Sequence, residues 1–255
     1  MSAPVIVVIT GPRDRQATLV ELERAAEILR ERAVAAGVLP VLRHGACPWR
    51  KSTGGHIPSI DLSVSSWVKA RGLAVVEPWP AEEHGPWPAC GPRRNLAMLA
   101  GRGQAEMFGP PASPPASLVL RFGDGGPGTT HCSDAAAAQG IEVERIEPGI
   151  EPKPWNVHWG DPSGPMTYVG RGHPLGNPTP LDVGDGETRA TAAPAALEDY
   201  RRHLGALVKA NDRDVLDALD SITPDHHLAC SCWPAHCHVE IIIRAWRWRS
   251  ATRDR

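Results

Sequence analysis

The sequence predicts an α/β protein in which a parallel sheet wrapped by helices is followed by a small α+β domain. Short, uninterrupted apolar runs rich in branched residues, such as residues 5–10 and 118–122, are typical of strands buried on both faces of a parallel sheet. Segments with apolar residues at three- and four-residue spacing separate these runs, and such alternation predicts crossover helices. After a proline-rich stretch the pattern changes. We therefore predict a first domain over residues 1–146, a linker over 147–165 and a second domain over 166–255.

The first helix has the most complete sequence signals. Apolar residues recur from Leu19 to Ala33, Thr18 with Glu21 forms a capping box, and Gly37 supplies the C-cap. Residues 78–92 are too rich in proline for regular structure. We predict strands at 5–10, 38–43, 73–77, 118–122 and 141–146, and further helices at 62–71, 93–100 and 133–139.

The second domain contains fewer and shorter elements. Residues 147–165 carry five prolines and few aliphatic residues, so this stretch is expected to be a semi-rigid linker. Beyond it we predict a strand at 166–169, helices at 195–210 and 215–222, an extended segment at 228–232, and a last helix from 236 or 237 to about 249.

A glycine-rich turn after the strand at residues 118–122 is the best candidate binding element. Its glycines permit positive φ and let backbone N–H groups approach an anion without a Cβ in the way. The helix that follows directs its partial positive charge to the same place. The turn therefore predicts a site for a nucleotide or phosphosugar, with a plain tight turn as the alternative. Its candidate binding residues are Gly125, Gly126, Gly128 and Thr129.

Polar residues at the ends of neighbouring strands are expected beside this turn. In a parallel sheet the carboxyl ends of the strands share one edge, where ligands bind. Arginine can hold phosphate in bidentate fashion, and aspartate can accept hydrogen bonds from ribose hydroxyls. Surface ion pairs and turn formation are the alternative roles, and for the histidine a loop hydrogen bond. The candidates are Gly11, Arg13, Asp14, His44, Arg94 and Asn95.

Three of the six cysteines lie within eight residues, at Cys230, Cys232 and Cys237. A zinc site needs about four ligands in tetrahedral array, and the fourth would come from His226, His227 or His236. In a second interpretation, Cys237 and His238 stand where a helix should begin, so that the helix dipole and the imidazole lower the thiol pKa and make Cys237 nucleophilic. Packing as small buried hydrophobic residues is the third. The reactive thiol is preferred because spacing fixes no fourth ligand; zinc is the one cofactor that the sequence suggests.

Two further segments carry candidate binding residues. Residues 170–178 form a loop with fixed turns, where Arg171 and Asn177 are candidates for binding an anion and chain reversal alone is the alternative. Residues 244–255 combine several arginines with Trp246 and Trp248, a combination that could contact nucleic acid through phosphates and stacking. A solvated helix end is the preferred interpretation of that stretch.

Composition excludes several functional classes. A net charge of −2 gives no global attraction to nucleic acid or to a membrane surface. No run approaches the ~18 apolar residues of a membrane span, and the chain passes directly into a strand without a signal peptide. Six cysteines in a chain of this length do not make a disulfide framework. We therefore expect a cytoplasmic protein that forms an oligomer and makes no membrane contact.

Motifs spread over most of the first domain carry a resemblance to a known family. They are Thr10 to Asp14, His44-Gly45, Asp61, Trp79, Gly91 to Asn95, and Phe122 with Gly125 to Thr129. In this order they resemble the SLOG superfamily of Rossmann-like nucleotide-binding domains, in the branch related to the YpsA protein. The resemblance implies a Rossmann-like fold for residues 5–146 and a nucleotide or nucleotide-derived ligand.

One position departs from the enzymatic members of that superfamily. Relatives that hydrolyse the N-glycosidic bond of a nucleotide carry a glutamate at the place matched here by Cys132. A thiol cannot replace a carboxylate in stabilising an oxocarbenium-like transition state or in activating water. The resemblance therefore does not by itself imply hydrolysis of this type.

Residues 167–243 resemble a small uncharacterised domain family found in bacteria and phages. Its marks are Gly-Arg-x-x-Pro-Leu-Gly-Asn-Pro and Cys-x-Cys-x-x-x-x-Cys-His, supplied here by residues 170–178 and 230–238. That resemblance implies no reaction. Because the two domains are fused, we expect the chain to bind a nucleotide-derived ligand and to process it by N-glycosidic hydrolysis or group transfer, with Arg171, Cys237 and His238 participating. A non-catalytic sensor that acts through a protein partner is the alternative.

Overall fold

In the computed structural model the chain divides into two compact units, Met1–Pro148 and Gly149–Arg255. The first unit contains a five-stranded sheet and the second a three-stranded sheet. Within the described part of the chain, no helix is both long and apolar enough to cross a membrane. The residues that the structure describes are 4–46, 49–50, 56–57, 59–102, 113–162, 164–179, 181 and 188–253.

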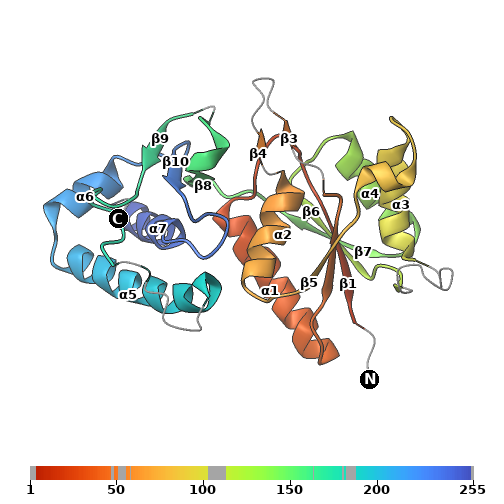
Figure 1. Cartoon of the computed structure of the whole chain (residues 1–255), viewed down its shortest axis with the longest axis horizontal. Helices are drawn as coiled ribbons and strands as arrows, with labels where there is room; N and C mark the ends of the chain where they lie inside the picture. Colours follow the sequence, from red (N-terminus) through yellow and green to blue (C-terminus); the bar gives the residue numbers. More distant parts are fainter. Residues whose placement is uncertain are drawn as a thin grey trace. The chain divides into compact units, whose positions relative to one another are not determined.

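The first unit is built on a sheet in which every pair of neighbouring strands is parallel. Its strands are β1 (Ile6–Thr10), β2 (Val41–His44), β5 (Val75–Pro78), β6 (Leu118–Phe122) and β7 (Glu142–Ile146), in the order β5-β2-β1-β6-β7. All five residues of β1 are buried because helices cover the sheet on both faces (Figure 1). The predicted α/β class, with a Rossmann-like parallel sheet wrapped by helices, is confirmed.

The strand order reverses beside β1, and this reversal determines where a ligand can bind. β2 and β5 lie on one side of β1, whereas β6 and β7 lie on the other. The chain leaves β1 and β6 toward opposite faces of the sheet, so a crevice opens between the carboxyl ends of these two strands. Gly11 and Gly123 are the first residues beyond those ends.

Helices cover both faces of the sheet (Figure 1). α1 (Leu19–Ala36) and α2 (Ile60–Ala70) lie on one face, and α3 (Cys90–Ala100) and α4 (Pro127–Ala138) lie on the other. The predicted caps of α1 are present. The Thr18 side chain accepts a hydrogen bond from the Glu21 amide, the Glu21 side chain accepts one from the Thr18 amide, and Gly37 ends the helix with a φ of 68°.

The layer beneath α3 and α4 contains an apolar core and the buried side chain of Arg43. The apolar members include Ile6, Val8, Trp79, Met98, Leu99, Val119, Cys132 and Ala136. Arg43 is fully buried, donates hydrogen bonds to the carbonyl oxygens of Met98 and Pro114 at 2.7 Å, and pairs with Glu77 at 3.0 Å. Its guanidinium charge is thus compensated, as a buried charge requires.

The second unit is smaller and combines a parallel sheet with helices. Its strands are β8 (Lys153–Asn156), β9 (Met166–Tyr168) and β10 (His227–Cys230), in the order β8-β10-β9. All four residues of the central strand β10 are buried. The helices are α5 (Arg189–Lys209), α6 (Arg213–Asp220) and α7 (Val239–Arg253).

The stretch 147–165, expected to be a linker, contains regular structure. β8 and a short 3-10 helix, η2 (Val157–Trp159), lie within it. β8 occupies an edge of its sheet, where a proline such as Pro154 is tolerated because one side of the strand needs no ladder hydrogen bonds. The expectation of a linker without strands is therefore wrong for these residues.

Other boundaries also differ from the sequence expectations. Residues 78–92 contain a 3-10 helix, η1 (Ala81–His84), and the first turn of α3, which begins at Cys90. α4 begins at Pro127, not at Ser133, because proline at the first helical position presets a helical φ and loses no hydrogen bond there. Two short antiparallel strands that the sequence did not predict, β3 (Trp49–Arg50) and β4 (His56–Ile57), pair with each other.

Candidate functional site

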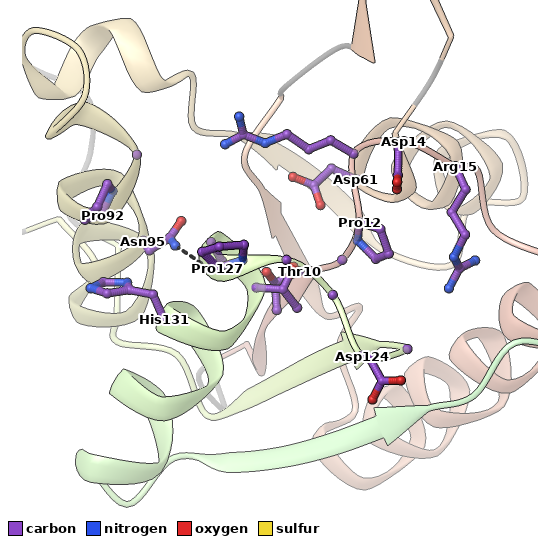
Figure 2. Close-up of a pocket in the computed structure, with 18 of the residues that line it drawn as sticks. Thr10, Pro12, Asp14, Arg15, Asp61, Pro92, Asn95, Asp124, Pro127 and His131 are labelled. Carbon is purple, nitrogen blue, oxygen red and sulfur yellow. Dashed lines mark hydrogen bonds between the residues drawn. The ribbon is translucent and has the colours of Figure 1, made fainter.

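A pocket of about 1050 Å³ lies within the first unit, at the carboxyl ends of β1 and β6. Five segments contribute to its lining: residues 10–15 at the end of β1, Asp61 at the start of α2, residues within 87–95 around the start of α3, residues within 123–131 around the start of α4, and Glu147 with Pro148 after β7. Figure 2 shows their side chains around one open space. Parts of the chain that are far apart in sequence therefore meet at the strand-order reversal, where ligands bind in sheets of this kind.

The glycine-rich turn forms one wall of this pocket, as predicted. Gly123 and Gly125 have φ values of 58° and 63°, a region that favours glycine. A Cβ on Gly125 would also collide with the Thr129 side chain. Gly126 is the N-cap of α4 and has no side chain to cap the helix. The predicted binding residues Gly125, Gly126, Gly128 and Thr129 all line the pocket, beside the positive end of the α4 dipole.

The turn after β1 forms the facing wall. Gly11 is required by packing, because a Cβ there would stand 2.6 Å from the Ile60 side chain. Arg13 and Asp14 are exposed and line the pocket, as predicted. Arg15 also lines it, but its guanidinium donates two hydrogen bonds of 2.7 Å to the buried carboxylate of Glu21. Arg13 is therefore better placed than Arg15 to meet an anion.

Arg94 and Asn95 belong to a buried network that holds the pocket walls together. Arg94 donates to the carbonyl oxygen of Gly45 at 2.9 Å and to Oδ1 of Asn95 at 2.8 Å. Asn95 in turn donates from Nδ2 to the carbonyl oxygen of Gly128 at 3.0 Å (Figure 2). The structure thus brings both predicted residues to the pocket, where they link the end of β2, α3 and α4.

Asp61 is a buried carboxyl group that opens onto the same pocket. It accepts a hydrogen bond from the Gly45 amide at 3.2 Å, and in Figure 2 its carboxyl group faces the open space. Burial raises the pKa of Asp61 to about 6, against the opposing charges of Arg94 and Arg13. Such a group can change protonation near neutral pH. The sequence marked Asp61 only as the start of a helix and as part of a family motif.

His44 lies outside the residues that line the pocket, although it was predicted as a binding residue. Its side chain is buried, and Nδ1 accepts a hydrogen bond from the Ala46 amide at 3.2 Å. Burial and the charge of Arg94 lower the pKa of His44 to about 4, so the imidazole is neutral at pH 7. These contacts match the loop hydrogen bond that was the alternative role for His44.

Two aromatic residues of the pocket were missed by the sequence reasoning. Trp87 lines the pocket with 76% of its surface exposed, which is unusual for so large an apolar side chain. His131 lines it from α4, and its buried Nδ1 has no hydrogen-bond partner among the described residues. Neither residue belongs to a recognisable motif. Only the exposure of Trp87 and the unsatisfied nitrogen of His131 identify them.

Cys132 occupies the core, not the pocket lining. Its side chain is fully buried within the apolar layer under α3 and α4, and burial raises its thiol pKa to about 12. Cys132 is therefore a neutral packing residue. Any carboxylate chemistry in this pocket must come from another position.

In the second unit, four donor groups converge: Cys230, Cys232, Cys237 and His238. Their candidate ligand atoms all lie within 4.8 Å of one another. The Sγ atom of Cys232 is 3.0 Å from that of Cys230 and 3.0 Å from that of Cys237. The structure thus confirms a Cys/His cluster that could hold a metal ion. The fourth donor is His238, and not His226, His227 or His236 as the zinc interpretation expected.

The reactive-thiol interpretation of Cys237 is disfavoured by its surroundings. Cys237 is fully buried, and burial raises the pKa of its thiol well above the ordinary value.

The segment 170–178 folds into turns beside this cluster. Within it, Arg171 is exposed, and Asn177 accepts a hydrogen bond from the Thr179 amide at 3.0 Å. Both residues lie in the second unit and are not among the residues that line the pocket of the first unit. Anion binding by Arg171 and Asn177 therefore stays a prediction.

The arginine-rich end of the chain makes several internal contacts. Arg249 donates two hydrogen bonds to Asp220, at 2.9 and 2.8 Å, and Arg247 donates to Glu151 at 2.6 Å. Trp246 donates from its ring nitrogen to the carbonyl oxygen of Ile222 at 2.9 Å. These side chains anchor α7 within the second unit, and the contact with nucleic acid that was the other interpretation of this stretch stays a prediction.

Comparison with known proteins identifies one family. Residues 155–248 match the family described as Domain of unknown function (DUF4326). The match covers the Cys/His cluster and most of the second unit, so the predicted resemblance of this part to an uncharacterised family is confirmed. No curated protein and no solved structure was found to match the chain.

Proposed function

We propose that the first unit binds a nucleotide or a nucleotide-derived ligand in the pocket between β1 and β6. The observation that carries the proposal is the meeting of the glycine-rich turn, the amino end of α4 and Arg13 on one pocket at the strand-order reversal. Backbone N–H groups of the turn and the arginine would hold phosphate oxygens. Asp14 would accept hydrogen bonds from a ribose, and the exposed Trp87 ring would stack on a base.

Membership of residues 5–146 in the SLOG superfamily is part of the same proposal. The residues that carry the resemblance and also line the pocket support it. These are Thr10 to Asp14, Asp61, Gly91, Pro92, Arg94, Asn95 and Gly125 to Thr129. A ligand of the nucleotide class is what such a relative would bind.

We further propose that the ligand is processed by cleavage or transfer at its N-glycosidic bond, with Asp61 as the acid or base. A carboxyl group with a pKa near 6 can donate a proton to a leaving base, or accept one from water, close to neutral pH. Asp61 would then supply the carboxylate that Cys132 cannot. The alternative is a sensor, in which the ligand binds without reaction and changes a contact with a protein partner.

The experiment is a titration of the full chain with a panel of nucleoside mono-, di- and triphosphates and nucleotide sugars in a calorimeter. Each mixture is afterwards separated by chromatography. We expect binding of at least one phosphorylated member and none of the matching nucleoside. A free base among the products supports N-glycosidic chemistry, whereas binding without product supports the sensor. Absence of heat with every member overturns the proposal.

The variant Asp61→Asn separates binding from reaction, because the amide can still accept the hydrogen bond from Gly45 but cannot exchange a proton. We expect it to keep ligand affinity within a few-fold and to lose turnover by about 100-fold or more. Asp134→Asn, an exposed change on α4, is the matched control and should alter neither quantity. Turnover that survives in Asp61→Asn removes Asp61 from the chemistry.

A further inference from the structure

The Cys/His cluster of the second unit has the composition of a zinc site. Three thiols and one imidazole lie with all four donor atoms within 4.8 Å of one another. Cys230, Cys237 and His238 are buried, and Cys232 is partly exposed. The three cysteines are free thiols, so no disulfide accounts for their proximity. Deprotonated thiols at this spacing would repel one another unless a cation lay between them.

His238 is oriented as a metal ligand would be. Its Nε2 atom lies 2.7 Å from the carbonyl oxygen of Val169, which can only accept, so Nε2 must carry the proton. The other ring nitrogen, Nδ1, therefore presents its lone pair, and this atom is 3.7 Å from Sγ of Cys230. A backbone carbonyl that fixes the tautomer of a ligating histidine is a recurrent feature of metal sites.

The loop that carries the donors is fixed by contacts other than those of the cluster. Asn156 at the end of β8 donates from Nδ2 to the carbonyl oxygen of Trp233, and the Trp233 ring is almost fully buried. This bond holds the turn that returns the chain from Cys232 to Cys237. β10 places Cys230 and the turn places Cys237 and His238, so the fold itself brings the donor atoms together.

From these observations we propose that Cys230, Cys232, Cys237 and His238 bind one zinc ion as a structural site. Three thiolates and an imidazole favour Zn²⁺ over Mg²⁺ or Ca²⁺, which prefer oxygen ligands. Four protein ligands complete a tetrahedron and leave no position for a substrate, so the ion stabilises the fold instead of acting in catalysis.

The same site would position the turn at residues 170–178. His238 holds Val169, the residue directly before that turn, and the Tyr200 ring packs edge-on against the His238 ring with centroids 5.4 Å apart. The Tyr200 hydroxyl donates to the carbonyl oxygen of Leu175 at 2.6 Å. The ion therefore fixes His238, His238 holds the start of the turn that carries Arg171, and Tyr200 holds Leu175 within it. His238 is in this sense also a positioning residue.

The first test is elemental analysis of the full chain, expressed with zinc in the medium and purified without added metal or chelator. We expect one zinc per chain, the same value for Cys90→Ala, which removes a buried cysteine of the first unit, and loss of zinc in Cys230→Ser. Iodoacetamide should modify the three cluster cysteines slowly until a strong chelator is added. The zinc content and the alkylation rate are both measured on the wild-type chain, so misfolding of a variant cannot hide whether the wild-type chain binds zinc.

A second test separates metal binding from packing at position 238. His238→Cys supplies a fourth thiolate and should keep one zinc, with stronger thiolate charge-transfer absorption after substitution by Co²⁺. Because Val169 loses its donor, amide exchange in residues 170–178 should become faster although the metal stays bound. His238→Ala should lower zinc affinity by about 10-fold or more.

Two results overturn the inference. One is a zinc content of the wild-type chain no higher than that of Cys230→Ser. The other is alkylation of Cys237 that is fast and independent of chelator, which would restore the reactive thiol. Unchanged exchange in residues 170–178 of His238→Cys refutes the positioning role alone. Nucleotide binding by the first unit does not enter these measurements, so the two proposals fail or succeed separately.

Discussion

Asn95 donates a hydrogen bond from Nδ2 to the main-chain carbonyl oxygen of Gly128 across 3.0 Å, and this bond joins α3 to the first turn of α4. Its Oδ1 atom simultaneously accepts from Arg94. One buried amide therefore holds the helix whose amino end faces the pocket. The bond uses one of the two N–H donors of the Asn95 amide, and the direct ligand contact predicted for Asn95 stays a prediction.

Asn95→Ala should weaken nucleotide binding about 10-fold and lower the free energy of unfolding by about 1–3 kcal/mol. Both effects follow because the change removes the hydrogen bond to the Gly128 carbonyl and leaves part of the buried Arg94 guanidinium without its acceptor, although Arg94 keeps its bond to Gly45. Calorimetry and urea unfolding measure the two quantities. Leu96→Ala, at a half-exposed position of the same helix, is the control and should change neither by much. Wild-type affinity in Asn95→Ala would show that the amino end of α4 does not depend on this bond.

Gly126→Asp should abolish nucleotide binding while the fold is retained. A Cβ at Gly126 meets no atom within 4 Å, and an aspartate at an N-cap stabilises a helix by accepting from its first turn. The same carboxylate places a negative charge where a phosphate would bind. Gly126→Asn, which caps without charge, should bind more weakly than wild type but more tightly than Gly126→Asp. Equal calorimetric affinities of the wild type and Gly126→Asp would exclude the glycine turn from the site.

Trp87→Ala should lower affinity for a nucleotide by about 10- to 100-fold, since stacking of one base on an aromatic ring contributes about 1–3 kcal/mol. The side chain is 76% exposed, so its removal should leave the free energy of unfolding within about 0.5 kcal/mol of wild type. Trp87→Phe retains a ring and should recover most of the affinity. If Trp87→Ala binds as wild type does, the base lies elsewhere in the pocket.

The pKa of Asp61 makes stability depend on pH with a defined sign. Burial raises this pKa to about 6 from an ordinary 3.8, so the folded chain holds the proton more tightly than the unfolded chain. The resulting stabilisation is complete below pH 4 and is lost as the pH rises through 6. The variant Asp61→Asn cannot ionise at this position, so it does not lose stability as the pH rises through 6. We therefore expect the variant to gain stability relative to wild type between pH 4 and pH 7.5, by about 3 kcal/mol at most.

Urea unfolding of both proteins at several pH values measures this gain. The difference between them cancels the opposite contribution of His44, whose pKa is lowered to about 4 and whose stabilisation is lost as the pH falls from 6.5 toward 4. Asp134→Asn, at an exposed carboxylate of α4, is the control and should show no pH-dependent gain. A gain that is independent of pH would contradict the buried-carboxyl assignment.

The first unit was largely predictable because its signals are local. The capping box of Thr18 and Glu21 and the apolar run of β1 depend on neighbouring residues alone, and both were identified from the sequence. β8 was not, since Pro154 argues against a strand unless the strand is known to lie at a sheet edge. The edge position of β8 and its pairing with β10 are features of the tertiary structure, which local sequence patterns do not show.

The sequence identified many of the residues at the two sites but said less about what each residue does there. The glycine turn, Arg13 and Asp14 line the pocket as the motif suggested, whereas Trp87 and His131 are identified only by exposure and by an unsatisfied nitrogen. In the second unit, the sequence spacing fixed no fourth ligand beside the three cysteines, and His238 was not among the candidates. The turn held by Asn156 brings Cys237 and His238 to the cluster, and no sequence spacing reveals that bond.

The four donors of the Cys/His cluster all fall within residues 230–238. An ion held there closes a loop of only about nine residues, so ion binding costs the unfolded chain little entropy. The unfolded chain can therefore compete for zinc, and the ion should raise the melting temperature less than its affinity for the folded protein suggests. During synthesis, the ion could load as soon as these nine residues leave the ribosome. The metal-bound loop would then be formed before Val169 and Tyr200 pack against His238, and metal supply would influence the order of folding as well as the final stability.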